Sequence, residues 1–455
     1  MDEDRVPAMV LSLLRLWPHG FACAAIAMAL AVPQKQKPVR GPKLPPVPTA
    51  MHIVCTPTSF VADNGPEVES KNSIATALSI AKPGARIELT PGEYRSFSIG
   101  FAKDSSGNAR TSGGTRAAPI VVDGRGQARI VGAGDTITVS QQIKNGFITF
   151  QNLEIRPGTR AGVLFSQGAD WVHEGYRFLD VNIIGQWNHV TDSGPSSSKW
   201  GVYGRGLKDF EFRGVRGRAR IVDLRREHAF YLQNLRGDVW IENVDVARVG
   251  RTFVQLTARI EEGPPGVGTL TIRNCTATDC CIAAGDNNKG GSAFTFAGRH
   301  AGTILLQGNR YRAGFAAEVR ALTRPESPYG TGALVAWDGN EGVPSAKLVL
   351  ESNDFEMAKG CGDRPLVAIG ACGAVELRGA NRFVSGANPA ALELEPVRES
   401  RPEGSPVGSL FLDPATVVTG PVRWRGTPIG LKELPKKYPS PPSPAPAPTP
   451  PSDKR

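Results

Sequence analysis

Three stretches of this chain can be laid on top of one another: Trp200-Gly-Val-Tyr-Gly-Arg205, His228-Ala-Phe-Tyr-Leu-Gln233 and Thr252-Phe-Val-Gln-Leu-Thr257. In each, bulky apolar residues alternate with variable ones, as in a β-strand that has one buried face. Five further stretches share the pattern: Ala161–Ser166, Ser292–Ala297, Ala333–Asp338, Pro365–Gly370 and Ala390–Glu395. Repetition at intervals of a few tens of residues predicts a solenoid, in which equivalent positions form straight columns.

A second set of strand-like stretches lies between the first. Its members are Phe147–Asn152, Tyr176–Asp180, Phe210–Gly214, Val239–Asn243, Leu270–Asn274, Ile304–Gly308, Leu348–Ser352 and Val375–Gly379. Each ends in Asn, Asp, Gly or Ser, which tolerate a sharp bend. Asparagines share one column at 152, 243 and 274, and recur one place later at 309 and 353. Stacked amides of this kind form hydrogen bonds between one coil of the solenoid (one rung of the stack) and the next. Two strand sets per repeat predict an all-β, single-stranded parallel β-helix.

The two ends of the chain differ in composition from the repeats. Residues 1–31 hold an apolar run with small residues near its end, which indicates a secretory signal peptide, with a retained anchor as the lesser alternative. Residues 32–50 read as a Pro/Lys-rich linker and residues 432–455 as a disordered Pro-rich tail. The β-helix is expected over 51–431. We therefore expect a secreted, periplasmic or cell-envelope protein without a membrane span in the mature chain.

The positive charge of the chain lies mostly in its ends. The formal net charge is +10, but residues 1–50 carry six basic and three acidic side chains, and residues 432–455 carry five and two. The body is therefore only +4. This balance, with no nucleic-acid-binding motif, argues against a nucleic-acid partner.

Six cysteines follow the signal segment: Cys55, Cys275, Cys280, Cys281, Cys361 and Cys372. An even number in an exported chain is compatible with disulfides, and Cys361 with Cys372 is the favoured pair. Buried thiols inside the stack are the alternative. The spacing around Cys280 lacks the paired ligands of a zinc site.

The entry into the repeats predicts an amphipathic helix over residues 70–82, which would cover the open end of the solenoid. The run Ile74-Ala-Thr-Ala-Leu through Pro91-Gly-Glu-Tyr94 resembles the opening of pectate-lyase-like right-handed parallel β-helix proteins, and so does Gly114–Gly124 followed by Ile130-Val-Gly132. The resemblance covers residues 70–400 in architecture. It implies a right-handed β-helix with an N-terminal α-helical cap. It implies no activity, because that superfamily includes lyases, hydrolases, epimerases and non-catalytic adhesins.

Polar and aromatic residues gather on the outward columns of the first strand set. The central column reads Leu164, Tyr203, Tyr231, Gln255, Thr295, Ala336, Ala368 and Glu393, and the next reads Ser166, Arg205, Gln233, Thr257, Ala297, Asp338, Gly370 and Glu395. Rungs lie about 4.8 Å apart, so three of them span about the length of a disaccharide. Aromatic faces bind sugar rings and arginine binds carboxylate or sulfate. We expect an anionic or polar glycan here. The alternative is an ordinary soluble surface.

The number of carboxylates limits the type of cleavage reaction that this face can carry out. Glycoside hydrolysis needs two carboxylates about 5–10 Å apart, but the middle columns offer only Glu227. Hydrolysis is therefore disfavoured. β-Elimination needs a cation to neutralise the uronate carboxylate and a side chain to remove the neighbouring proton.

The segment Arg225–Asn234 carries these residue types. By their spacing His228, Tyr231 and Gln233 are expected to share one outward face. We predict His228 as the base and Tyr231 as acid or base. Arg226, or Arg251 and Arg259 one rung later, is the predicted carboxylate ligand. A histidine that only bonds backbone at a turn is the alternative. The predicted substrate-binding residues are Tyr203, Arg205, Gln233, Arg251, Gln255, Arg259 and Arg299.

One loop of the sequence carries oxygen ligands of the kind that a metal ion binds. The loop Asp286-Asn-Asn288 is compatible with Ca²⁺ but also with a solvated turn, so no cofactor is expected and Ca²⁺ is the lesser option. A stretch from Asn288 to Asn309 faintly resembles the alginate lyase and chondroitinase B family, with a spacing too short to transfer catalytic roles. The sequence thus predicts a protein that binds or processes polysaccharide, with a lyase acting on uronate glycans as the finer hypothesis. A non-catalytic envelope or adhesive scaffold is the alternative.

Overall fold

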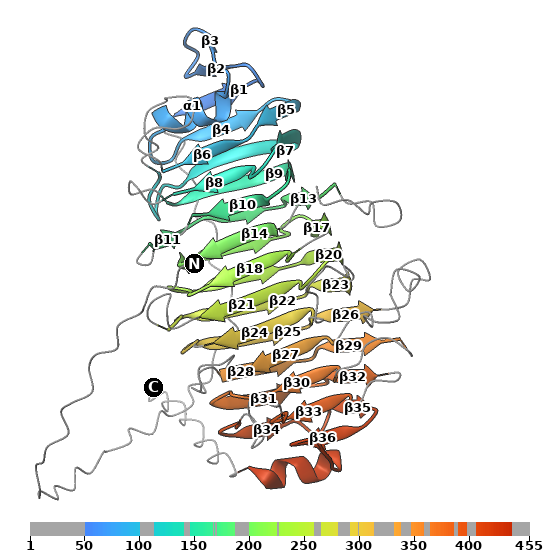
Figure 1. The fold of residues 1–455 in the computed structure, drawn as a ribbon. Helices are drawn as coiled ribbons and strands as arrows, with labels where there is room; N and C mark the ends of the chain where they lie inside the picture. The colour runs from blue at the N-terminus through green and yellow to red at the C-terminus, as the bar shows by residue number, and fades with distance from the viewer. Residues whose placement is uncertain are drawn as a thin grey trace, which may run out of the picture. The chain divides into compact units, whose positions relative to one another are not determined.

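The chain forms a stack of coils whose strands pair in parallel with the coils before and after (Figure 1). The computed structural model describes residues 51–100, 113–140, 146–166, 168, 171–186, 200–224, 227–258, 265–280, 292–298, 300–313, 332–337, 347–358, 365–385, 390–397 and 406–438. The fold predicted from the sequence, an all-β right-handed parallel β-helix with an N-terminal helical cap, is confirmed.

One side of the stack is a sheet of 12 strands that contains the first strand set. Its members are β6 (Phe97–Ile99), β8 (Ile137–Val139), β10 (Ala161–Phe165), β14 (Trp200–Arg205), β18 (Phe230–Gln233), β21 (Val254–Ala258), β24 (Phe294–Gly298), β27 (Leu334–Trp337), β30 (Val367–Ile369), β33 (Leu392–Leu394), β36 (Val422–Trp424) and β37 (Thr427–Pro428). All but the last pair, a hairpin, are parallel. This sheet carries the candidate site.

The second strand set forms part of a sheet of 23 strands. Its strands are β4 (Arg86–Leu89), β7 (Ile120–Val131), β9 (Ile148–Arg156), β12 (Arg177–Leu179), β16 (Phe210–Arg213), β19 (Val239–Glu242), β22 (Thr269–Arg273), β25 (Thr303–Gln307), β28 (Lys347–Glu351), β31 (Ala374–Arg378) and β34 (Leu410–Leu412). The predicted register of this set places equivalent turn residues on successive coils.

A third strand set corrects the expectation of two per repeat. It comprises β5 (Gly92–Arg95), the second halves of β7 and β9, β13 (Asn182–Ile184), β17 (Ala219–Leu224), β20 (Val244–Val249), β23 (Thr276–Cys280), β26 (Arg310–Ala313), β29 (Asp354–Met357), β32 (Arg382–Ser385) and β35 (Val417–Thr419). Only a short bend separates these strands from the second set. In sequence they therefore read as the continuation of a turn.

The bend between the second and third sets is made by residues with left-handed backbone. Asn152, Asn243 and Asn274 have φ of 53°, 54° and 53°. Asp180, Ser352, Gly308 and Gly379 occupy the same place in other coils, also at positive φ. Only glycine and short polar side chains adopt this conformation at low cost, which explains the residue types of this column.

The predicted asparagine ladder forms one place after that bend. The backbone N–H of Asn309 donates to Oδ1 of Asn353 at 3.0 Å, and that of Asn353 donates to Oδ1 of Asn381 at 3.0 Å. Asn353 Nδ2 also donates to the Leu306 carbonyl at 2.9 Å. All three asparagines are at most 1% exposed. Each amide thus satisfies backbone groups of its neighbours in the interior, where an unpaired polar group is costly.

Phenylalanines form a row through the interior. Successive ring contacts run from Phe97 through Phe150, Phe178, Phe212, Phe230, Phe253, Phe294 and Phe355 to Phe383, with centroids 5.1–6.1 Å apart. Aromatic pairs at this spacing add to the stability supplied by burial.

Both ends of the stack are covered. At the start, α1 (Ser73–Ile80) begins at Asn72, whose side chain accepts from the backbone N–H of Ala75, and packs its apolar face on the first coil. Strands β1 (His52–Cys55), β2 (Ser59–Ala62) and β3 (Val68–Glu69) form antiparallel pairs beside it. At the other end, the 3-10 helix Leu431–Lys437 buries Leu434. The ordered body therefore continues past residue 431, where the sequence placed its end.

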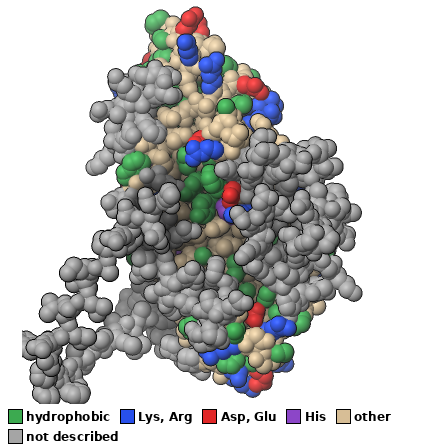
Figure 2. Space-filling view, viewed as in Figure 1, with side chains coloured by type: hydrophobic (Ala, Val, Ile, Leu, Met, Phe, Trp, Pro, Cys, Tyr) green, Lys and Arg blue, Asp and Glu red, His purple; other side chains and the backbone are tan. Residues whose placement is uncertain are grey.

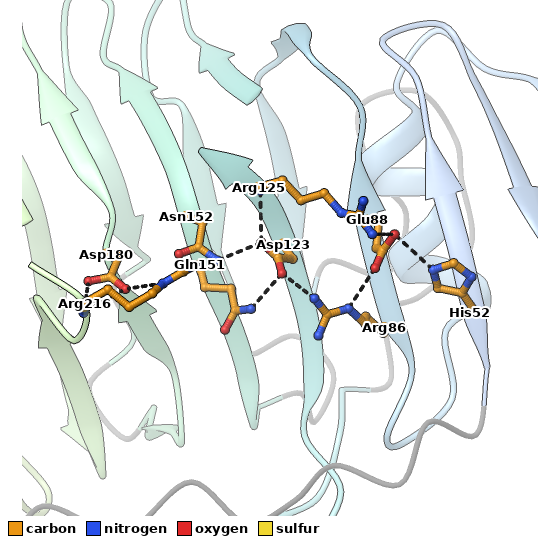
Figure 3. A network of polar contacts seen from close by, with 9 residues as sticks. All are labelled: His52, Arg86, Glu88, Asp123, Arg125, Gln151, Asn152, Asp180 and Arg216. Carbon is orange, nitrogen blue, oxygen red and sulfur yellow. Dashed lines mark hydrogen bonds and ion pairs between the residues drawn. The ribbon is translucent and has the colours of Figure 1, made fainter. Parts of the chain in front are cut away.

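A polar network joins the first coils at one corner (Figure 3). Asp123 accepts hydrogen bonds from Gln151 Nε2 at 2.9 Å and Asn152 Nδ2 at 2.8 Å on the next coil. On the preceding coil Arg86 lies between Asp123 and Glu88. Charged and amide side chains thus connect β4, β7 and β9 in the same direction as the backbone ladder.

Cysteines in the described part of the chain are buried thiols. Cys55, Cys275, Cys280 and Cys372 are all buried, as the alternative to disulfides predicted. Cys361, the expected partner of Cys372, and Cys281 lie outside the described residues, as do the predicted signal peptide, the linker and the tail from residue 439. Among the described helices, none combines the length and apolar character needed to cross a membrane.

Replacing Asn353 by alanine should lower the free energy of unfolding by about 2–4 kcal/mol, because buried backbone groups on two neighbouring coils lose their partners. Urea unfolding followed by circular dichroism measures this. The control is Asn182→Ala, where the half-buried side chain accepts one hydrogen bond, from Arg220 N–H, and the cost should stay below about 1 kcal/mol. Equal losses would contradict the ladder's role.

Two buried histidines should make the protein sensitive to acid. Burial lowers the pKa of His173 and of His300 to about 4. The folded state therefore keeps both rings neutral, while the unfolded chain takes up protons below its ordinary pKa of about 6.5. Stability is complete above about pH 6.5 and falls by roughly 3 kcal/mol per histidine as the pH drops to about 4. Thermal unfolding between these pH values measures the loss. His173→Phe should flatten the dependence, and an unchanged slope would contradict it.

Candidate functional site

The outer face of the 12-stranded sheet carries the predicted columns. Val202, Phe230 and Val254 point inward and are fully buried. Tyr203 pairs in register with Tyr231, and Tyr231 with Gln255, so these outward residues form one column across β14, β18 and β21. The alternation predicted from the sequence is correct for these strands.

One rung of the column is displaced from its predicted place. Thr295 pairs with Val335, and Val335 with Ala368 and then Glu393. The sequence alignment had put Ala336 in this column, and Ala336 instead points inward with 3% exposure. Leu334, Val335, Ala336 and Trp337 are all apolar, and therefore the pattern fits either register. Asp338, assigned to the next column, lies outside the described residues, and Trp337 pairs with Ala297 in its place.

Four aromatic rings lie in contact at the centre of this face. Ring centroids are 5.0 Å apart for Trp200 and Tyr203, 4.9 Å for Tyr203 and Tyr231, and 5.1 Å for Tyr231 and His228. We call these four residues the aromatic row. Figure 2 shows hydrophobic side chains over β14 and β18, with acidic, basic and histidine side chains beside them. Tyr203 and Tyr231 touch across neighbouring strands because rung spacing and favourable ring separation are nearly equal. Trp200 and His228 each contact the tyrosine three residues later in their own coil.

A buried glutamine joins the two tyrosines. The Tyr203 hydroxyl donates to Gln233 Oε1 at 3.1 Å, and Gln233 Nε2 donates to the Tyr231 hydroxyl at 3.0 Å. Gln233 is 4% exposed and Tyr203 9%, whereas Tyr231 is half-buried. Gln233 therefore holds the hydroxyl of Tyr231 from the same strand, and that hydroxyl keeps its own proton for a further bond.

His228 is buried, and both of its ring nitrogens have partners. It is 3% exposed. Nδ1 lies 2.5 Å from Thr252 Oγ1 and Nε2 lies 3.3 Å from Glu227 Oε2. Burial lowers the pKa of His228, although the neighbouring Glu227 opposes this. The ring is therefore neutral at neutral pH and supports Tyr231 through its face.

Glu227 joins His228 to Arg251, one of the arginines predicted to contact the substrate. Arg251 NH1 lies 3.2 Å from Glu227 Oε2. The Arg251 side chain is 38% exposed, so it lies at the edge of the aromatic row with its charge near solvent. A half-exposed arginine of this kind can pair with a ligand carboxylate while it remains bound to Glu227.

The predicted site residues are thus brought together only in part. His228, Tyr231, Tyr203 and Gln233 form one contact network, but His228 and Gln233 are covered, contrary to the shared outward face expected from their spacing. The half-buried Gln255 and Arg205 lie on the two columns. Arg226, Arg259 and Arg299 lie outside the described residues. The catalytic and binding roles assigned to this set stay predictions.

The described residues hold no group of three His, Cys, Asp or Glu side chains arranged for a metal ion. The loop Asp286–Lys289, which was considered for Ca²⁺, lies outside them.

Sequence reasoning missed one member of this network, Thr252. It is the first residue of its strand-like stretch, as His228 is of the preceding one, so the repeat alignment already placed the two side by side. The alignment does not show that both side chains are buried and face each other, which is what their hydrogen bond requires. The Glu227–His228 contact was missed for another reason: neighbours in sequence face each other only where a turn bends the backbone.

Comparisons with known proteins give fold-level similarity. No protein-family model and no curated protein matches the chain. Among solved structures it is similar to the pectate lyase Pel9A, with 11% identity, a TM-score of 0.47 and coverage of 74% of this chain and 76% of that one. It is also similar to an alginate lyase from a Paenibacillus strain, with 13% identity, a TM-score of 0.44 and coverage of 74% and 96%. Similarities at this level say nothing about which activity the chain has. The β-helix architecture that residues 74–94 predicted is shown by the strand pairing of the chain itself.

Replacing Gln233 by leucine should lower the free energy of unfolding by about 1–3 kcal/mol, because both tyrosine hydroxyls lose their common partner in a covered site. Urea unfolding measures the change. Gln255→Leu, on the next strand and half-buried, is the matched control and should change stability by less than about 0.5 kcal/mol. A Gln233 variant as stable as this control would contradict the bridge between the tyrosines.

Proposed function

We propose that this protein binds a polysaccharide across the outer face of the 12-stranded sheet, with Tyr231 as the central contact. The observation that carries the proposal is the aromatic row. Tyr231 presents a half-exposed ring that is held in place by Tyr203, His228 and Gln233. A rigid ring with a polar tip suits the mixed apolar and hydroxyl surface of a sugar.

Neighbouring residues supply the polar contacts that a glycan needs. Gln255 and Thr295 continue the column beyond Tyr231, and both are half-buried side chains that can exchange hydrogen bonds with hydroxyl groups. Arg251 lies at the edge of the row with part of its side chain exposed. A uronate ring on Tyr231 can direct its carboxylate toward this cation, which favours an anionic glycan over a neutral one.

Cleavage by β-elimination is the second candidate function. The Tyr231 hydroxyl accepts a bond from Gln233 Nε2, so its own proton is available for a bond to a ligand. In this reaction a base removes the proton beside the uronate carboxylate, the bond to the leaving sugar oxygen breaks, and that oxygen is protonated. Tyr231 is better placed than His228 for these transfers, because the ring nitrogens of His228 are already engaged. Binding without cleavage corresponds to the adhesive or envelope scaffold.

Binding is tested on the purified protein with polygalacturonate, alginate, hyaluronan and a neutral glucan, by affinity electrophoresis and calorimetry. Tyr231→Ala should weaken binding of the preferred glycan about tenfold or more, because the stacking surface is lost. Gln255→Ala should have a smaller effect. Binding to none of the glycans, or binding that is equal in Tyr231→Ala, would overturn the proposal.

The same samples test elimination through the ultraviolet absorbance of the unsaturated product. Tyr231→Phe should retain binding and lose the absorbance change, because the ring remains and the hydroxyl is gone. Binding without any absorbance change in the unmodified protein would assign the face to adhesion rather than catalysis.

A further inference from the structure

A hollow lies on the same face, several rungs beyond the aromatic row. Its volume is about 310 Å³, and it is lined by Ser292, Leu334, Val335, Pro365, Ala368, Glu393, Pro396 and Val397. Apolar residues make up most of this lining, and Glu393 brings one carboxyl group. A single sugar ring presents the matching chemistry, with apolar C–H faces and hydroxyl edges.

The hollow continues the column that contains Tyr231. Strand register takes this column from Tyr231 through Gln255 and Thr295 to Val335, and then to Ala368 and Glu393. Four rung spacings separate Tyr231 from Ala368, which is about 19 Å. At about one sugar ring per rung, a glycan that lies along the column reaches the hollow with its fourth or fifth ring.

We propose that this hollow is a second sugar-binding subsite, which receives a ring of the same glycan that contacts Tyr231. The inference rests on the proposed function and adds the direction and the length of the bound glycan. The chain of sugars runs parallel to the stacking direction of the coils, from Tyr231 toward Glu393.

The lining determines how the ring sits. Val335 and Ala368 form the floor, and Val397, 44% exposed, stands at the rim. Glu393 is 9% exposed, and a carboxyl group has several acceptor positions, so it can receive sugar hydroxyls in addition to its contacts within the protein. Because a carboxylate repels another carboxylate, the ring must turn its hydroxyl edge, and not a uronate carboxylate, toward Glu393.

The test measures affinity against glycan length. Calorimetry would use disaccharides, trisaccharides, pentasaccharides and hexasaccharides prepared from polygalacturonate and from alginate. The pentasaccharide should bind at least about tenfold more tightly than the trisaccharide, through the apolar surface of the ring that enters the hollow. Ala368→Phe fills the hollow and should abolish this gain, while the affinity for the disaccharide stays unchanged.

A second variant covers the case in which Ala368→Phe does not fold. Val397→Asp places a charge at the exposed rim and should also remove the length gain. Val267→Asp is its matched control, because Val267 is 45% exposed and does not line the hollow. Tyr231→Ala should weaken every length.

The outcomes separate the two proposals. Equal affinity for trisaccharide and pentasaccharide, or a length gain that survives both Ala368→Phe and Val397→Asp, overturns the subsite and leaves binding at Tyr231 in place. No binding of any oligosaccharide overturns both.

Discussion

The left-handed bend that ends the second strand of most coils is the constraint on which the rest of this structure depends. Residues such as Asn152, Asn243 and Gly308 adopt positive φ at equivalent places. This lets the chain turn within one residue and begin the third strand in the same register on successive coils. Since a shift of one residue would exchange the buried and exposed faces of a strand, register decides both the interior and the outer columns.

Stacking in register explains why the interior and the site are built in the same way. Phe150, Phe178 and Phe212 contact one another along the interior because register brings equivalent positions of successive coils together. Phenylalanines from the other strand sets continue the row. The aromatic row forms outside for the same reason, with Tyr203 and Tyr231 paired across neighbouring strands. Rung spacing sets the separation of the two tyrosine rings. A surface made of such columns suits an elongated ligand with its own repeat, and a glycan has one.

The burial of His228 changes its role. In sequence, His228 beside Arg225, Arg226 and Glu227 is the candidate base, with a histidine that bonds backbone at a turn as the alternative. In the structure its ring lies under Tyr231, with Thr252 and Glu227 on its two nitrogens. A group enclosed in this way supports its neighbours, so the hydroxyl of the half-buried Tyr231 is the better candidate for proton transfer. Glu393, to which the sequence assigned no role, lines the hollow together with residues from three other coils that are distant in sequence.

The sequence by itself determined the fold class, the N-terminal cap, the turn residues and most members of the outward column. These features follow from local periodicity, because the pattern of buried, variable and turn positions can be recognised within each repeat. Only the tertiary structure decided the register at Val335, the third strand of each coil and the burial of His228. Leu334, Val335, Ala336 and Trp337 are all apolar, so this stretch is compatible with either register. Pairing with the neighbouring strands determines which one forms. The burial of His228 and the hollow at Glu393 depend on contacts between side chains of different coils. A single stretch of sequence does not contain that information.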